Sequence, residues 1–544
     1  MSAPTIAIQR MMTCASRIPA RLGLPDSTEP ASPKCVSRRA RLRISAVLLA
    51  AALSLGAPAG HCQTWKFEPG VYLQETFTNN VDLVPSSAAT ADFVTEITPV
   101  LHITEKSPRT SLNGSIAVQG LLYARTGAEN NQLYPLANLL GNAELVDHFF
   151  FVEAAVVASQ QFFTPFGAQP INIANATDNR YTSVTYRVSP YIQGVTSGNI
   201  NYLLRNNSTW ANLSGTPLEV NNSYTSEWVG RIESKRTPLG WYADFNLTDV
   251  KFNNQAPQQT NLGRVGSNYD YNAQIHFHAD VGYEDNHYPL SDYRGYIYGV
   301  GFEWHPTERT NAVVNWEHRF FGSSYLVTFD HRTPLSAWSF IASRNITSYP
   351  QQLAALPAGN VQGILNQLFL SRIPDLTQRQ GVIDALIQNQ GLPANLLNPV
   401  NLYSQQILLT ENVTATVGML GARNSLFLSL FYLRQEPISG SGTALPPILS
   451  TAINNTTQQG ASLIWTHNLT SSMILNLTVQ GSQSKLQEPL TGTTNNGSVR
   501  LFLTQPISER TTVFAGARYQ ISRSDLSPDY NEAAIFAGLN YTYK

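Results

Sequence analysis

Apolar and polar residues alternate with a period of two along most of the chain after residue 65, and segment 293–332 shows this most clearly. The apolar face of its first strand consists of Tyr296, Tyr298, Val300, Phe302 and Trp304. The opposite face carries Gly295, Glu303 and His305. Alternation of this kind predicts β-strands that have one apolar and one polar face.

Two details favour a transmembrane barrel over a soluble antiparallel sheet. The apolar faces are rich in Tyr, Trp and Phe near strand ends, as in the aromatic girdles of membrane barrels. The opposite faces mix charges with glycine, which a dry core would accept only at a large desolvation cost but a polar lumen accepts readily. The candidate lumen-facing charges are Glu303, Glu317, Arg319, Asp330 and Arg332.

These five charges have two interpretations. Charged side chains that face a pore set its conductance and ion preference. Alternatively, opposite charges on neighbouring strands brace the wall through cross-strand pairs. The two roles are compatible, and the sequence leaves both open.

Short and long connections between the strands alternate along the chain. Segments 306–309 and 507–510 are short, whereas 81–91 and 436–456 are long. Outer-membrane barrels have short periplasmic turns and longer extracellular loops. Counting segments of about ten alternating residues predicts roughly 22 strands, within a range of about 16 to 24. We therefore expect an all-β fold, a transmembrane antiparallel β-barrel over residues 63–544.

Residues 351–404 interrupt the strand pattern with helical periodicity. The apolar positions that define the two helices are Ile364, Leu365, Leu368, Phe369, Val382, Ile383, Leu386 and Ile387. Asp375 and Gln378 form a capping box, and Gly391 with Pro393 is expected to end the second helix. Counting strands outward from the N-terminus places this insertion in an extracellular loop. A barrel this wide is usually plugged, so we expect a lid or plug above or inside the mouth, or a surface cap without a gating role.

The N-terminal region has the features of a secretory signal peptide. An arginine-rich stretch precedes the apolar core 44–55 and a small-residue exit, so residues 1–62 are expected to be a leader. All three cysteines lie within this leader, which argues against a disulfide framework or thiolate metal site in the barrel. Charged residues make up 13% of the chain and the net charge is −1. This composition gives no reason to expect a nucleic-acid partner.

The C-terminal strand ends with a glycine followed by aromatic residues. Gly538, Tyr541 and Tyr543 resemble the signal that outer-membrane barrels present to their assembly machinery, although Lys544 follows where the pattern usually ends on an aromatic residue.

Catalytic and metal-binding patterns are sparse. His276, His278 and Asp280 share one strand face, a candidate metal arrangement for which a polar region near the barrel rim is the favoured explanation. Glu284 to His287 is better explained as a solvated hairpin end. The chain contains no G-x-S-x-G, phosphate-binding glycine loop or dinucleotide fingerprint. We therefore expect no catalytic residue, no metal, no cofactor and no enzymatic activity.

Several segments resemble a known family of outer-membrane proteins associated with the PEP-CTERM/exosortase system. The resemblance is carried by residues 77–103, 131–161, 281–288, 317–325 and 371–382, with Asn79 where members more often have Asp. That family is described from its genomic neighbourhood, near exopolysaccharide and protein-sorting genes of Gram-negative bacteria. The resemblance implies an outer-membrane location, reached through signal-peptide-dependent export. The expected partners are outer-membrane lipid and lipopolysaccharide, the barrel assembly machinery, and exopolysaccharide or its export machinery.

Three functions fit this sequence. The first is a channel or export component linked to exopolysaccharide or sorted-protein secretion. The second is a structural or assembly barrel whose surface loops anchor extracellular matrix. The third, an outer-membrane hydrolase, is disfavoured by the missing motif. A TonB-dependent receptor is not expected, because strands begin a few residues after the signal and leave no room for an N-terminal plug domain.

Overall fold

The strands and helices of the barrel follow from a computed structural model of the chain. The structure describes residues 64–543 except for 216–221, 236–237, 254–255, 290, 355–360, 391–395, 402, 439–454 and 489–490. The signal-peptide prediction for residues 1–62 lies outside the described residues.

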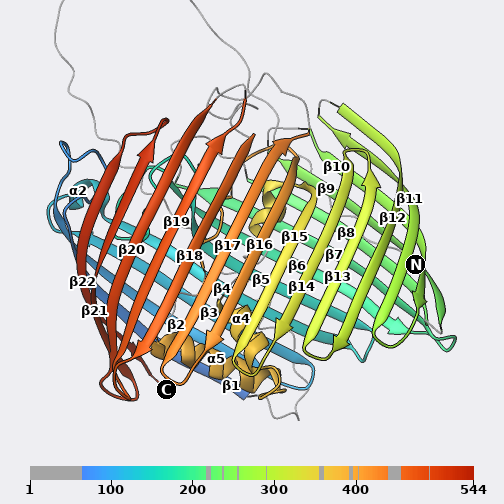
Figure 1. Ribbon diagram of the computed structural model, residues 1–544, viewed down its shortest axis with the longest axis horizontal. Helices are drawn as coiled ribbons and strands as arrows, with labels where there is room; N and C mark the ends of the chain where they lie inside the picture. Colours follow the sequence, from blue (N-terminus) through green and yellow to red (C-terminus); the bar gives the residue numbers. More distant parts are fainter. Residues whose placement is uncertain are drawn as a thin grey trace, which may run out of the picture. The chain divides into compact units, whose positions relative to one another are not determined.

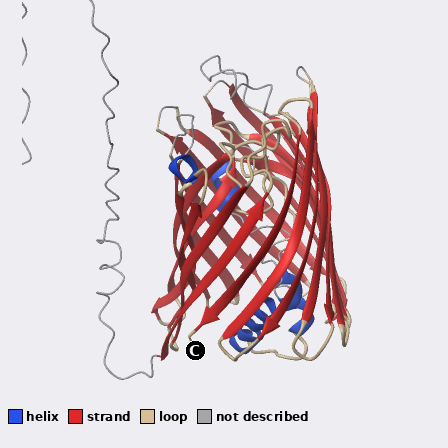
Figure 2. Ribbon diagram, turned by 90° about the vertical axis from the view of Figure 1, so that its left-hand side faces the viewer, coloured by secondary structure: helices blue, strands red, loops and turns tan. Residues whose placement is uncertain are grey.

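Most of the described chain consists of long antiparallel strands (Figures 1 and 2). The strands are β1 (Thr64–Thr78), β2 (Asp92–Lys106), β3 (Thr110–Tyr123), β4 (Gln132–Val146), β5 (Phe150–Phe162), β6 (Arg180–Val195), β7 (Ile200–Ser214), β8 (Ser223–Ser234), β9 (Leu239–Phe252), β10 (Gln258–Asp270), β11 (Ile275–Tyr288), β12 (Ser291–Thr307), β13 (Thr310–Arg319), β14 (Gly322–Arg332), β15 (Ser336–Thr347), β16 (Leu408–Leu420), β17 (Asn424–Pro437), β18 (Thr456–Asn468), β19 (Ile474–Leu486), β20 (Gly492–Pro506), β21 (Thr511–Ser524) and β22 (Tyr530–Thr542).

The sheet closes on itself. Each strand pairs with its neighbours in sequence, and the first strand pairs with the last from Gly70↔Thr542 to Thr78↔Ala534. Closure satisfies the backbone groups that an open edge would leave unpaired. The predicted fold, a 22-stranded antiparallel β-barrel, is therefore confirmed for the part of the chain that the structure describes.

Side chains alternate between the outer surface and the lumen. In β12, Tyr296 is 81% exposed on the outside, whereas the neighbouring Ile297 is 1% exposed on the inside. Because residues that pair across strands share a face, the register assigns every strand residue to the wall's inner or outer side. The outer face is the apolar, aromatic one, as membrane-spanning barrels require.

The two ends of the barrel differ. At one end, short turns such as 107–109 and 333–335 connect the strands, and the first and last strands begin and end there. At the other end lie the longer connections, including 79–91, 163–179 and 348–407. We call these the short-turn end and the long-loop end. By the rule for outer-membrane barrels they correspond to the periplasmic and extracellular sides.

The described helices are short, and none is long and apolar enough to cross a membrane. They are α2 (Gly127–Asn130), α3 (Tyr349–Ala354), α4 (Val361–Phe369) and α5 (Leu376–Gln390). The last three belong to the connection 348–407 between β15 and β16, which we call the insert. Helices α4 and α5 together are the plug.

The position of the plug differs from the sequence prediction. We expected the helices at the extracellular mouth, but α4 and α5 lie at the short-turn end, whereas α3 remains near the long-loop end (Figures 1 and 2). Helix α4 packs against β15 and β16 beside Ala337 and Gly418, which lie near the short-turn ends of those strands. The insert therefore runs down the lumen and back. Helical periodicity does not reveal how deep in the lumen the helices lie. It identifies the apolar face of each helix but not the surface against which that face packs.

Candidate functional site: the lumen and its plug

The plug packs on a row of apolar residues on the inner wall. Ala337 of β15 pairs with Gly418 of β16, Gly418 with Phe427 of β17, and Phe427 with Ile464 of β18. Phe427 is fully buried, and Ile464 is 2% exposed. We call these four residues the apolar row. Gly418 provides the space for α4, because a Cβ built there would lie 2.4 Å from Cγ2 of Ile364.

Seven of the eight predicted helix positions form the contact with this wall or with the partner helix. Ile364, Leu365, Leu368 and Ile383 are buried in one cluster with the apolar row. Phe369, Leu386 and Ile387 pack against that cluster, whereas Val382 is 41% exposed. The apolar faces of α4 and α5 thus meet each other and the barrel wall together, which a surface cap would not do.

Polar contacts fix the turn between the two helices. The backbone N–H of Gln378 donates to Oδ1 of Asp375 (2.8 Å), which is the N-cap half of the predicted capping box. The buried Arg379 donates from Nη1 to the carbonyls of Ile373 (2.7 Å) and Pro374 (2.9 Å). Arg372 donates to the carbonyl of Pro334 in the β14–β15 turn (2.8 Å), which ties the plug to the short-turn end. The predicted stop at Gly391 and Pro393 lies outside the described residues.

The rest of the insert contacts both sides of the inner wall near the long-loop end. Tyr349 of α3 and Tyr403 of the returning segment pack with Tyr181 of β6 in a buried aromatic cluster. The side chain of Gln458 exchanges two hydrogen bonds of 2.9 Å with the backbone of Val400. These contacts hold both connecting segments of the insert to inward-facing wall positions.

A second loop, 163–179, folds inward and is tied to the strands where the barrel closes. Arg518 and Glu532 form an ion pair of 2.9 Å, with side chains 1% and 0% exposed. Asn175 of the loop accepts from Arg518 (3.0 Å) and donates to Glu532 (3.2 Å). The loop thereby narrows the lumen near its long-loop end. The sequence showed no sign of this network, because Asn175 lies more than 340 residues from Arg518 and Glu532 along the chain.

The inner face of β5 to β13, which we call the charged wall, carries a ladder of paired charges. Arg187 and Arg205 both contact Glu153, at 2.8 and 2.9 Å. Arg264 contacts Asp244 at 2.7 Å and also contacts Glu317. Each guanidinium in these pairs has a carboxylate from a different strand. The charges therefore brace the wall.

Glycines allow Arg264 of β10 to reach Glu317 of β13. A Cβ at Gly282 of β11 would lie 2.8 Å from Cγ of Arg264, and one at Gly299 of β12 would lie 2.9 Å from Cγ of Glu317. Because these two glycines have no side chains, Arg264 and Glu317 can contact each other across β11 and β12.

The five predicted charges all lie on the inner face of β12 to β14, and two of them pair with charges outside the predicted set. Glu317 pairs with Arg264, and Arg319 pairs with the fully buried Glu284 at 2.7 Å. Glu303 lies 3.9 Å from His305, and Asp330 and Arg332 lie near the short-turn end of β14. Arg332 also borders a hollow beside the α4–α5 turn. The partners Arg264 and Glu284 were not among the five predicted charges. Both lie on the polar face of the alternating segment 258–288, so the same pattern could have identified them.

The candidate metal residues are separated by their own contacts. His276 Nδ1 lies 2.6 Å from Asp270, and Asp280 accepts a hydrogen bond of 2.9 Å from Tyr242. His278 packs on Gly301, where a Cβ would lie 1.9 Å from its ring. Among the described residues, the group whose ligand atoms lie within 4.8 Å of one another is Glu144, Asp147 and His148, in the short β4–β5 turn. Asp147 and His148 are exposed and Asp147 contacts Arg109, so this group is an open surface turn.

The C-terminal glycine has a packing role. A Cβ at Gly538 would lie 2.5 Å from the ring of Phe514, so the glycine makes room for that inward-facing aromatic residue. Tyr541 and Tyr543 are 37% and 53% exposed at the short-turn end. Their role as an assembly signal stays a prediction.

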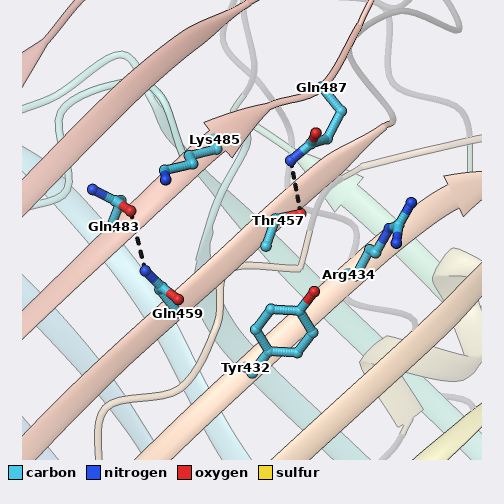
Figure 3. Close-up of a pocket in the computed structure, with 7 residues that line it drawn as sticks. All are labelled: Tyr432, Arg434, Thr457, Gln459, Gln483, Lys485 and Gln487. Atoms are coloured by element: carbon cyan, nitrogen blue, oxygen red, sulfur yellow. Dashed lines mark hydrogen bonds between the residues drawn. The ribbon is translucent and has the colours of Figure 1, made fainter.

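A polar hollow lies on the outside of the barrel, near the long-loop end of β17 to β19 (Figure 3). Gln459 and Gln483 hydrogen-bond across it at 3.1 Å, beside Arg434 and Lys485. Because charged side chains on the outer wall are tolerated only near the membrane interfaces, this hollow marks the edge of the lipid-facing band. It is separate from the lumen.

Several solved structures are similar to this chain at low sequence identity. No family model and no curated protein matches the chain. Among solved structures, Pseudomonas aeruginosa OccK1 (OpdK) is 6% identical, with a TM-score of 0.34, 88% of this chain and 99% of that chain covered. The FrpB iron transporter from Neisseria meningitidis is 8% identical, with a TM-score of 0.46 and 88% and 81% covered. The siderophore receptor PirA from Pseudomonas aeruginosa is 10% identical, with a TM-score of 0.37 and the same coverage.

Proposed function

We propose that the protein is an outer-membrane channel for hydrophilic solutes, and that the plug closes its lumen and moves to open it. The observation that carries the proposal is the apolar row, a matched surface on the inner wall for two amphipathic helices. The contact is confined to one end of the barrel and to a few side chains. The plug can therefore leave the wall without breaking the strand hydrogen bonds that close the barrel.

The wall beneath the plug supports this function. The inward positions of β15 to β19, which we call the neutral wall, carry Ser, Thr, Asn, Gln and apolar residues but no Asp, Glu, Lys or Arg. A wall of hydroxyl and amide groups offers hydrogen bonds to a passing solute without holding counter-ions. The family resemblance adds exopolysaccharide or sorted-protein secretion as the process that such a channel serves, in the outer membrane of a Gram-negative bacterium.

A reversible cross-link between the plug and the wall tests gating. A Cβ on Gly418 would lie 2.4 Å from Cγ2 of Ile364, so the two Cβ atoms lie within about 4 Å after adding one carbon–carbon bond of about 1.5 Å. This separation suits a disulfide, whose Cβ atoms lie about 3.5–4.5 Å apart. We expect the double variant Ile364→Cys/Gly418→Cys to show low conductance in planar bilayers when oxidised and a several-fold higher conductance after reduction.

Two controls make the outcome decisive. Each single cysteine variant should conduct equally with and without reductant. A variant in which residues 361–390 are replaced by a flexible Gly/Ser linker should conduct continuously. If reduction leaves the double variant closed while the linker variant conducts, the plug is a fixed constriction, and our gating proposal is wrong.

A structural role is the second candidate, because the long-loop end is narrowed by three segments that are tied to the wall. These are α3, the segment around Tyr403 and loop 163–179. A barrel closed at both ends would serve as a rigid platform for surface loops. The linker variant separates the two functions, because a platform would remain non-conducting when the plug is removed.

A further inference from the structure

Arg500 of β20 lies at mid-height on the inner wall, on the same row of paired residues as the plug contact. Ile464 pairs with Thr478 of β19, and Thr478 pairs with Arg500. On the β19 side of this row, Arg500 is the first charged residue beyond the neutral wall.

The guanidinium of Arg500 lacks a carboxylate partner among the described residues. Its Cζ lies 4.6 Å from the ring centroid of Phe502 and 4.7 Å from that of Phe536, and its buried Nε makes no hydrogen bond. Arg518, the residue paired with it on β21, shows the contrast, because that arginine forms an ion pair of 2.9 Å with Glu532. Two aromatic rings thus fix the orientation of a guanidinium that makes no direct ion pair with a carboxylate among the described residues, since Glu96 of β2 acts on it only through a longer-range electrostatic interaction.

This guanidinium opens into a cavity of about 450 Å³ between the wall and the inward-folded segments. Ser462, Gln480 and Ser498 line it with polar groups, and the buried Oγ of Ser462 has no hydrogen-bond partner. Tyr72 and Phe514, stacked with centroids 5.4 Å apart, line another side. Ile171 of loop 163–179 and Ile387, Leu396 and Leu397 of the insert complete the enclosure.

We propose that this cavity binds a ring-shaped organic carboxylate, with the carboxylate on Arg500 and the ring against Tyr72 and Phe514. A guanidinium presents paired donors that match the two oxygens of a carboxylate. The cavity volume is typical of small-molecule sites, which combine apolar walls with a few oriented polar groups. An aromatic acid and a sugar acid share this chemistry.

The bound acid would also contact the plug. Ile387 belongs to α5 and Leu396 to the segment that follows it, so an acid in this cavity touches the part of the insert that the proposed channel must move. The proposal names the solute class of the proposed channel and rests on that function.

Binding to the purified full-length protein tests the inference without measuring conductance. We would titrate it with benzoate and with glucuronate by isothermal calorimetry, using benzamide and glucose as the matched neutral probes. At least one acid should bind, and at least tenfold more tightly than its neutral match. Tight benzoate identifies an aromatic acid as the source, and tight glucuronate identifies a sugar acid.

Variants then locate the site. Arg500→Gln should weaken binding at least tenfold, Arg500→Lys less than that, and Arg434→Gln, on the outer wall, should leave it unchanged. Circular dichroism checks that each barrel is folded. If neither acid exceeds its neutral match, or if a folded Arg500→Gln protein binds as tightly as the unaltered one, the inference is wrong. Because conductance is not measured, a closed channel would leave this result intact.

Discussion

The charged wall and the neutral wall differ in the side chains that they present to the lumen. The charged wall, β5 to β13, faces the lumen with carboxylates and guanidinium groups that pair with each other, as Arg264 does with Asp244. The neutral wall, β15 to β19, faces it with hydroxyl, amide and apolar groups. The plug packs on the neutral wall at the short-turn end, whereas α3 and the segment around Tyr403 contact the charged wall near its long-loop rim.

The difference explains where the plug can pack. Covering a charged group with an apolar helix removes it from water, at a cost of several kcal/mol per ion. Covering Ala337, Gly418, Phe427 and Ile464 removes only apolar surface from water, which is favourable at about 25 cal/mol per Å². The chemistry of the wall therefore determines the side of the lumen on which the helices lie.

The strongest way to break this contrast is to place a charge beneath the plug. Phe427→Glu would bury a carboxylate without a partner under α4, a cost of several kcal/mol that exceeds the gain from the contact. We expect the plug to leave the wall and the conductance in planar bilayers to rise several-fold. Phe427→Leu is the control, since it keeps the site apolar and should remain closed. Closed behaviour of Phe427→Glu would contradict the role of wall chemistry.

Removing a charge from the charged wall should affect stability instead. Glu284 is fully buried, accepts from Arg319 at 2.7 Å and from the backbone N–H of Phe320 at 2.8 Å. Glu284→Gln would leave the buried guanidinium of Arg319 without its partner, which typically costs about 3–5 kcal/mol. We expect a lower midpoint of guanidinium-induced unfolding with unchanged plug closure. A midpoint equal to that of the unaltered protein would show that the pair contributes nothing.

The sequence was sufficient for the barrel because its signal is local. Period-two alternation, as at Tyr296 to Trp304, and alternating connection lengths depend on neighbouring residues only. The helical positions Ile364 and Leu365 were visible for the same reason. Their depth in the lumen was not, because it depends on pairings between strands.

One signal for that depth was present in segment 424–437. Leu428 and Leu430 face outward, but Phe427 and Phe431 face inward, so this strand is apolar on both sides. A strand apolar on both faces is normally covered on both. The ladder from Arg264 to Glu317 offered no such signal, because its contact crosses two strands over glycines and follows from the register alone.

A purely steric change tests the plug contact without adding charge. Gly418→Val would place a Cβ 2.4 Å from Cγ2 of Ile364, and overpacking of this kind costs about 1–3 kcal/mol. We expect partial displacement of the plug, seen as more frequent open events in single-channel recordings. Gly295→Val is the matched control on the inner wall, because the nearest atom there lies 3.8 Å from a built Cβ. Equal recordings from the two variants would contradict the tight contact.

The smallest change in stability is expected at Asp285, the residue next to Glu284, where the largest is expected. Asp285 follows Glu284 in β11 but lies on the outer face, where it contacts Arg294 at 2.8 Å, and their side chains are 34% and 58% exposed. Exposed ion pairs contribute about 0–1 kcal/mol, because solvent screens them. Asp285→Asn should therefore leave the unfolding midpoint nearly unchanged, while Glu284→Gln lowers it. If both variants lowered the unfolding midpoint by similar amounts, the buried pair of Glu284 would contribute no more than the exposed pair of Asp285. That result would contradict the contrast between paired lumen charges and solvent-screened ones.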